Sequence, residues 1–438
     1  MKYLAHLFVP LCLATPLGAA DLTVRAQDFH DADPRQAQIG QLLFYDKVLS
    51  GNQNISCGTC HHHNHGTGDG LSLGVGEGGQ GLGIMRMAGL GDDAIRKRIP
   101  RNAPPLWNLG HKDINVLFHD GRLEVSDIYQ NGFNSPAEEW LPAGLPNILA
   151  AQALFPLTAQ FEMAGNPKEN EVAGAVHDRI DAAWPIIAKR VRVIPEYGDM
   201  FVHAFDDVDD ATQVDITHIA TALSAFMNSE FQSFDSAWDA YLAGTPLPPM
   251  AEQGRALFFG KGQCSTCHTG ALFSDQSYHA LGLPAFGPGR TRRFDPIPRD
   301  VGRMGESDAL EDAYRFKTPM LRNVALTAPY GHNGAYPTLT DMIRHHLNPE
   351  QARAEWTRSD AKLTEAPWLQ AIDFVIQTDS REMARQASAL DITPVEMLDA
   401  EVAQIEAFLN ALTGQFAATG VFKLGIPDSV PSGLPVDR

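Results

Sequence analysis

Two short motifs of the same form constrain this chain more than any other feature of its sequence. Cys57-Gly58-Thr59-Cys60-His61 lies in the first half, and Cys264-Ser265-Thr266-Cys267-His268 lies in the second. C-x-x-C-H is the attachment signal for c-type haem, in which two thiols bind the porphyrin edge and the histidine reaches the iron. A four-cysteine zinc site needs its pairs about 15–20 residues apart, and a thioredoxin-like C-x-x-C needs no histidine. The sequence therefore predicts two covalent haems, attached at Cys57, Cys60, Cys264 and Cys267, with His61 and His268 as proximal iron ligands.

The length and the charge of the chain limit the number of its domains and the kinds of partner that it can bind. With 438 residues it has room for two or three domains. Its net charge of −19 argues against nucleic acid and against an anionic membrane surface as partners. An acidic face would suit a basic redox protein.

The N-terminus has the pattern of a secretion signal. Lys2 is followed by an apolar run over residues 3–13 and by the small residues Gly18-Ala19-Ala20. The run is too short to span a membrane, so we expect residues 1–20 to be removed, Cys12 included, without leaving a membrane anchor. The four remaining cysteines all belong to the two motifs, so we expect no disulfide. Haem attachment outside the cytoplasm predicts the periplasm of a Gram-negative bacterium.

The apolar periodicity predicts a mainly α-helical chain with long loops and few strands. Residues 215–243 carry apolar side chains at helical spacing, and Gly244-Thr245-Pro246 ends that pattern. A second amphipathic pattern runs over residues 402–412 and stops at Gly414. We therefore expect an N-terminal domain over residues 21–246, a C-terminal domain over 247–416 and a tail over 417–438.

Two further patterns follow the first motif. His62, His63 and His65 come directly after the proximal ligand, so they lie on its side of the haem and are expected to be solvated or to face the propionates. Residues 74–79 match G-x-G-x-x-G but follow no apolar strand, so a dinucleotide site fails its context test. A glycine-rich loop that passes close to a haem is the better interpretation.

Beyond the two motifs, Asp120-Gly121-Arg122 and residues 318–330, which read TPMLRNVALTAPY, resemble the bacterial di-haem cytochrome c peroxidases. The same superfamily contains the methylamine-utilisation maturase, which oxidises tryptophans in a partner protein, and the chain looks nearer to that branch. The resemblance covers about residues 35–415. It implies two all-α cytochrome c-like domains in one chain. The N-terminal haem would react with hydrogen peroxide, and the C-terminal haem would relay electrons.

The resemblance also implies roles for individual residues. Glu162, within Thr158-Ala159-Gln160-Phe161-Glu162-Met163, matches the family's distal acid–base glutamate, and Gln152 matches a distal-pocket glutamine. Asn102, with the carbonyls of Thr327 and Pro329, matches an interdomain calcium site. Amide and carbonyl oxygens suit that ion.

The first haem region departs from the family pattern at two positions. Val75 stands where peroxidases of this family can have a distal histidine, so we expect a haem iron that is five-coordinate or holds only water, with Met85 and Met87 as alternative ligands. His119 stands where the family has a tryptophan between the haems, which puts electron relay through a tryptophan in doubt.

The third departure concerns the second haem. His346 stands where the peroxidases have an axial methionine and the maturase a tyrosine. His345 is turned about 100° away on the same helix, and Met342, one turn earlier, is the rival ligand. An axial histidine lowers the haem potential relative to methionine, which favours oxidation of a partner protein's aromatic residue over simple cytochrome c peroxidation.

These residues together predict an enzyme that activates hydrogen peroxide, with Glu162 moving the proton during O–O cleavage. The electrons would come from a small redox protein or from a Trp or Tyr of a partner protein. The alternative is a di-haem electron-carrier cytochrome without catalytic chemistry, in which both irons are six-coordinate. Nothing in the sequence indicates a signalling domain.

Overall fold

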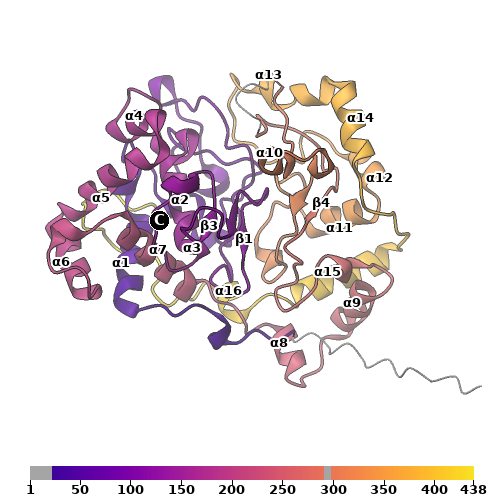
Figure 1. Ribbon diagram of the computed structural model, residues 1–438. Helices are drawn as coiled ribbons and strands as arrows, with labels where there is room; N and C mark the ends of the chain where they lie inside the picture. Colours follow the sequence, from indigo (N-terminus) through magenta and orange to yellow (C-terminus); the bar gives the residue numbers. More distant parts are fainter. Residues whose placement is uncertain (1–21, 291–296) are drawn as a thin grey trace, which may run out of the picture.

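The computed structural model describes residues 22–290 and 297–438, so the expected signal peptide lies outside the described residues. Most regular elements are helices and the strands are two or three residues long, which confirms the expected mainly helical class. In the described residues, no helix is long and apolar enough to cross a membrane. The two halves of the sequence lie side by side in Figure 1.

Seven helices and a small sheet form the first half. The helices are α1 Pro34–Tyr45, α2 Cys57–Cys60, α3 Ile148–Ala153, α4 Glu171–Asp178, α5 Trp184–Arg192, α6 Pro195–Ala204 and α7 Ile216–Glu230. The antiparallel sheet has the order β1 Val116–Leu117, β2 Leu123–Val125 and β3 Phe133–Asn134.

The second half is also helical. Its helices are α8 Ala237–Leu242, α9 Pro249–Phe259, α10 Met304–Ser307, α11 Leu339–Leu347, α12 Pro349–Glu355, α13 Gln370–Asp373, α14 Ser380–Ser388, α15 Asp399–Asn410 and α16 Gln415–Thr419. The strands β4 Tyr278–His279 and β5 Phe316–Lys317 pair antiparallel.

One pair of helices crosses closely in each half, and a glycine at each crossing makes this possible. In the first half, a Cβ on Gly40 of α1 would lie 1.9 Å from the carbonyl oxygen of Ala222 in α7. In the second half, a Cβ on Gly254 of α9 would lie 1.8 Å from the carbonyl oxygen of Gln404 in α15. A C-x-x-C-H motif follows α1 and α9 in turn, so the two halves repeat one arrangement.

The helical pattern over residues 215–243 forms two helices rather than one. The helix α7 ends at Glu230, and α8 begins at Ala237 after an irregular turn. Trp238 of α8 is buried against Phe273 and Phe408 in the core of the second half. This packing assigns α8 to the second half, although it precedes the boundary expected at residue 246.

The segment expected to be a tail, residues 417–438, packs on the first half (Figure 1). Ala417 and Val430 are buried in the core of that half. The ring of Phe422 contacts the imidazole of His63 edge to face, with 4.2 Å between ring centroids. Asp437 accepts hydrogen bonds from Thr59 in α2, at 2.6 Å, and from Lys47, at 2.7 Å. The segment therefore covers the first C-x-x-C-H motif.

Candidate functional site

The helix α2 presents the first motif. His61 follows α2, and its Nδ1–H group donates to the carbonyl oxygen of Thr67 at 3.1 Å. Burial lowers the pKa of His61, which favours a neutral ring. With Nδ1 occupied in this way, Nε2 is the nitrogen that remains for an iron.

The second motif repeats this arrangement. His268 donates from Nδ1 to the carbonyl oxygen of Phe273, again at 3.1 Å. Burial lowers the pKa of His268 to about 4, and the neighbouring His346 adds to the effect. All four motif cysteines are free thiols in the structure. Each motif thus has two thiols and an oriented imidazole, the donor set that a c-type haem requires.

His346 faces His268. The two ring centroids are 6.2 Å apart, and His346 donates from Nδ1 to the carbonyl oxygen of Met342 at 2.9 Å. Two imidazoles that bind one metal from opposite sides, with metal–nitrogen bonds of about 2.0–2.1 Å, place their centroids roughly 6–6.5 Å apart. The pair therefore fits a haem iron between two histidines.

The neighbour of His346 points elsewhere. His345 is buried, with Nδ1 bonded to the hydroxyl of Tyr336 at 2.8 Å and Nε2 donating to the carbonyl oxygen of Leu281 at 2.7 Å. The structure therefore brings only one histidine of this pair to His268, as the rotation along α11 predicts.

Glu162 lies in a turn of π-helix, Gln160–Ala164, in the first half. Burial raises the pKa of Glu162, while the charges of Arg122 and Arg290 oppose that rise. The charge of Glu162 also contributes, after burial, to the raised pKa of the Cys60 thiol, so this carboxyl lies near the first motif. Gln152 is half-buried on the neighbouring helix α3.

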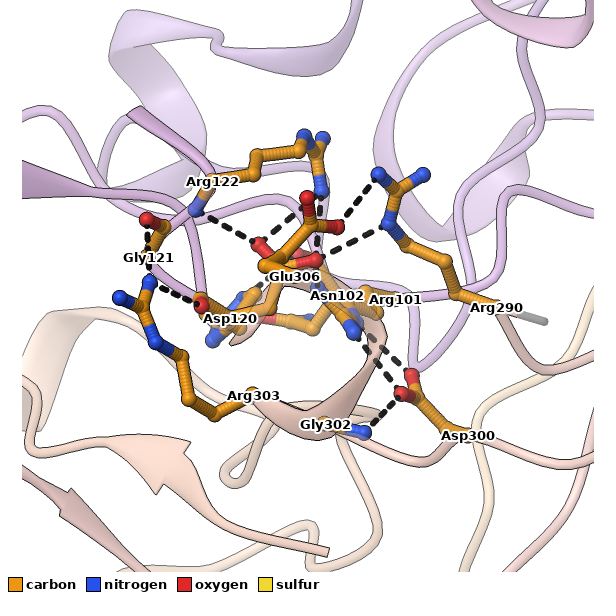
Figure 2. Close-up of polar contacts among 11 residues, drawn as sticks. Arg101, Asn102, Asp120, Gly121, Arg122, Arg290, Asp300, Gly302, Arg303 and Glu306 are labelled. Carbon is orange, nitrogen blue, oxygen red and sulfur yellow. Dashed lines mark hydrogen bonds and ion pairs between the residues drawn. The ribbon is translucent and has the colours of Figure 1, made fainter. Parts of the chain in front are cut away.

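Asp120 is the centre of a charged network between the halves (Figure 2). Its Oδ2 atom lies 2.7 Å from Arg101, 3.2 Å from Arg122 and 2.9 Å from Arg290. Burial alone would raise the pKa of Asp120, but the three guanidinium groups outweigh it and hold the pKa well below its usual range. Arg101 in turn forms two bonds to Asp300, at 2.7 and 2.8 Å. The network ties the first half to the loop that precedes α10.

Gly121 is required next to Asp120 for two reasons. Its φ is +68°, a conformation that side chains rarely adopt, and a Cβ would lie 1.7 Å from the Tyr278 hydroxyl. Its carbonyl oxygen also accepts a hydrogen bond of 2.7 Å from Arg303 (Figure 2). The Asp-Gly-Arg motif is therefore the junction of the two halves.

Two imidazoles with lowered pKa values belong to the same interface. His119 donates from Nε2 to the carbonyl oxygen of Asn102 at 3.2 Å, and its pKa is lowered to about 4 by burial and then by the charge of Arg101. Burial likewise lowers the pKa of His332 to about 3, and its ring stacks on Phe316 with centroids 3.5 Å apart. Both rings are neutral near pH 7.

The histidines after the first motif are not solvated as expected. His62 and His63 are 1% and 4% exposed. His63 bonds to the hydroxyl of Tyr45 and, at 3.2 Å, to Glu230. The solvated alternative was therefore wrong for His62 and His63, and Phe422 packs on His63. A position that faces the haem propionates stays a prediction.

The two methionines named as alternative ligands of the first haem are exposed, and Val75 is buried. Met85 and Met87 are 79% and 59% exposed. Val75 is fully buried in an apolar cluster with Ala366 and Leu369 of the second half.

One of the proposed calcium ligands, Asn102, is bonded to the segment that follows the other two. The main-chain nitrogen of Asn102 donates to the carbonyl oxygen of His332 at 2.9 Å, and its side-chain nitrogen donates to Leu71 at 2.8 Å. These bonds leave the side-chain oxygen of Asn102 available. The carbonyls of Thr327 and Pro329 belong to the segment just before His332. Calcium binding there stays a prediction.

Sequence reasoning missed two buried charged residues near the first motif. Asp69 is 1% exposed, and burial raises its pKa to about 7. Arg86 is 3% exposed and bonds only to backbone carbonyls within the described residues. The one signal in the sequence was an arginine among glycines, in a loop with a shortage of acidic neighbours.

The chain is similar to known proteins along most of its length. A family model described as di-haem cytochrome c peroxidase matches residues 34–246. The methylamine utilization protein MauG of Paracoccus denitrificans is 29% identical over 424 residues, 92% of this chain and 94% of that protein. Cytochrome c551 peroxidase of Pseudomonas aeruginosa is 28% identical over 312 residues, 70% of each chain. Over most of its length the chain is therefore similar to members of the di-haem cytochrome c peroxidase superfamily.

A solved structure extends this likeness beyond the residues that the family model matches. A MauG-like protein associated with microbial copper homeostasis has a TM-score of 0.58 and 25% identity, covering 93% of this chain and 97% of that one. The homologues named cytochrome c peroxidase and MauG support a di-haem peroxidase-like oxidoreductase, a family that implies two haems. The predicted resemblance is confirmed.

Proposed function

We propose that this chain is a periplasmic di-haem c-type oxidoreductase. It activates hydrogen peroxide at the N-terminal haem and draws electrons through the C-terminal haem, either from an aromatic residue of a partner protein or from a small redox protein. The observation that carries this proposal is the difference between the two motifs. His268 faces His346, whereas His63, after His61, bonds to Glu230 and the carboxyl of Glu162 lies near the first motif.

The residues support separate roles for the two sites. A ferric haem bound at the first motif would supply an iron able to bind peroxide and to take up its two oxidising equivalents. Glu162 would remove a proton from the peroxide and return it to the leaving oxygen, which would depart as water. The raised pKa of Glu162 brings that carboxyl closer to neutrality, where an acid–base group works best.

The surface supports electron entry at the second site. Thr59, between the cysteines of the first motif, is fully buried and bonded to Asp437. The corresponding Thr266 of the second motif is exposed. Electron transfer between proteins requires close approach, so a donor reaches the second site more readily.

Two measurements test the proposal. The electron paramagnetic resonance spectrum of the resting ferric protein is expected to show one high-spin and one low-spin haem. Peroxide is expected to change the absorbance rapidly, and reduced cytochrome c serves as a trial donor. Two purely low-spin haems with no reaction would instead support the electron-carrier alternative.

A further inference from the structure

The glycine-rich loop, residues 74–81, supports the backbone that carries Glu162. A Cβ on Gly76 would lie 2.0 Å from the carbonyl oxygen of Phe161 and 2.9 Å from the Cα atom of Glu162. The main-chain nitrogen of Glu77 donates to the same carbonyl of Phe161 at 3.2 Å. Only a glycine allows this approach of the loop to the Glu162 turn. The approach of the loop to a haem stays a prediction.

The π-turn that carries Glu162 depends on this contact with the glycine-rich loop. Ala159 precedes the turn Gln160–Ala164. Its carbonyl oxygen accepts hydrogen bonds from the main-chain nitrogens of Glu162 and Met163 at 3.1 Å and of Ala164 at 3.0 Å. One carbonyl has two lone pairs, so three donors share it imperfectly. Single π-turns of this kind are rare in proteins, and a large share of those known lie at functional sites.

Arg86 fixes the loop from its other side. Its guanidinium donates to the carbonyl oxygens of Val75 at 2.5 Å, Gly76 at 2.8 Å and Gly81 at 2.7 Å. No carboxylate of the described residues forms an ion pair with it. A buried cation is costly to desolvate, and three hydrogen bonds to carbonyls offset that cost only while the loop keeps this shape.

We propose that Arg86 is a positioning residue for the peroxide reaction: by clamping residues 75, 76 and 81 it presses the loop against the π-turn and fixes the Glu162 carboxyl. This inference rests on the proposed function, because it assumes that Glu162 moves the proton.

The clamp acts through geometry rather than through charge. The charged groups that act on Glu162 are Arg122 and Arg290, from the two sides of the interface, and Arg86 is not among them. Loss of the clamp would loosen the turn and admit water. Because burial is what raises the pKa of Glu162, that pKa would then fall toward its ordinary value.

The variants Arg86→Gln and Arg86→Lys test the clamp, since lysine keeps the charge but not the three-carbonyl fork. Both are expected to slow the peroxide reaction at pH 7 by about 10²-fold, the effect of a misplacement of about 1 Å. Both are also expected to move the acid limb of the pH profile to lower pH. Hydrogen exchange, read by mass spectrometry on a peptide that spans residues 159–165, is expected to become faster.

Gly76→Ala is a second route to the same result, because its Cβ would displace the turn while Arg86 stays intact. Arg98→Lys is the matched control. Arg98 is another buried arginine of the same region, but it bonds to Asp373 at 2.9 and 3.0 Å and not to the loop. The Arg98→Lys variant is expected to lower the stability of the protein. It should leave the acid limb of the pH–rate profile and the hydrogen-exchange rate of residues 159–165 unchanged.

The outcomes separate the two proposals. A wild-type protein that does not react with peroxide contradicts the proposed function. Suppose that the wild type reacts, but Arg86→Gln and Gly76→Ala leave both the acid limb of the pH profile and the hydrogen-exchange rate of residues 159–165 unchanged. The proposal that Arg86 positions Glu162 is then wrong. A limb that moves in Arg86→Gln but not in Arg86→Lys would show a charge effect and would also overturn it.

Discussion

The Glu162 carboxyl is subject to opposing influences from its surroundings. Burial disfavours the carboxylate, whereas Arg122 and Arg290 favour it, and the net pKa is raised. The carboxylate is the form that accepts the peroxide proton, so the rate should fall as the pH drops through this raised pKa. The acid limb is therefore expected above the ordinary glutamate value of 4.5.

Glu162→Gln is expected to slow the reaction with peroxide by about 10²–10⁴-fold, the usual contribution of an acid–base group. Both haems should stay attached, because Glu162 belongs to neither motif. Stopped-flow absorbance measures the rate.

Glu139→Gln, which changes an exposed carboxyl, is the control and should react like the wild type. The acid limb should also be absent from the profile of Glu162→Gln. An unchanged rate in that variant would remove Glu162 from the mechanism.

His346→Ala is expected to abolish the low-spin signal of the second haem, because the variant removes the imidazole that faces His268. A redox titration should show that haem at a higher potential when a weaker ligand replaces histidine. Met342→Ala is the matched control from the same helix and should keep the wild-type spectrum. If Met342→Ala loses the signal and His346→Ala keeps it, the axial ligand is Met342.

At the scale of elements, each half depends on one close helix crossing. α1 meets α7 at Gly40, and α9 meets α15 at Gly254. Each crossing brings backbone against backbone with no room for a methyl group. The helix that leads into a motif is fixed this way, so the position of each proximal histidine depends on a glycine far from the iron site.

Gly254→Ala should therefore destabilise the protein by about 1–3 kcal/mol, the usual cost of overpacking a core. Thermal unfolding measures the change. Gly174→Ala in α4 is the control, because nothing lies within 4 Å of its Cβ position. Alanine is a better helix former than glycine, so Gly174→Ala should be neutral or slightly stabilising. An equal loss of stability in Gly254→Ala and Gly174→Ala would contradict the argument that Gly254 is needed for the close helix crossing.

At the scale of the whole molecule, the two halves meet in a network of buried charge around Asp120 (Figure 2). Asp120 balances arginines from both halves, Arg101 and Arg122 from the first and Arg290 from the second. Because its pKa is depressed in the folded state, its contribution to stability is present above the unfolded pKa. That contribution is lost as the pH falls toward the folded value.

Asp120→Asn should cost about 3–5 kcal/mol, since it removes the carboxylate that Arg101, Arg122 and Arg290 share. Chemical denaturation at pH 7 measures the loss. Asp127→Asn, at an exposed position, should have no effect. If the denaturation midpoint of Asp120→Asn stays unchanged, other acceptors provide the hydrogen bonds that the arginines need.

Local spacing made part of this structure predictable. The motifs follow from C-x-x-C-H, and the phase of α11 separates His346 from His345. Long-range contacts were not predictable, because no local pattern encodes them. The burial of His63 depends on Phe422, and Thr59 bonds to Asp437 across 378 residues. Likewise, nothing around Arg86 in the sequence indicates which carbonyls it contacts.

The contact between Thr59 and Asp437 has a consequence for the order of maturation. A chain made from its N-terminus presents Cys57 and Cys60 long before residues 417–438 exist to cover them. A haem that binds at the first motif would therefore have an interval in which Thr59 is still uncovered, and that interval ends when this segment arrives. In a chain cut before residue 417, Thr59 would lose its bond to Asp437 and that side of the motif would be in contact with water.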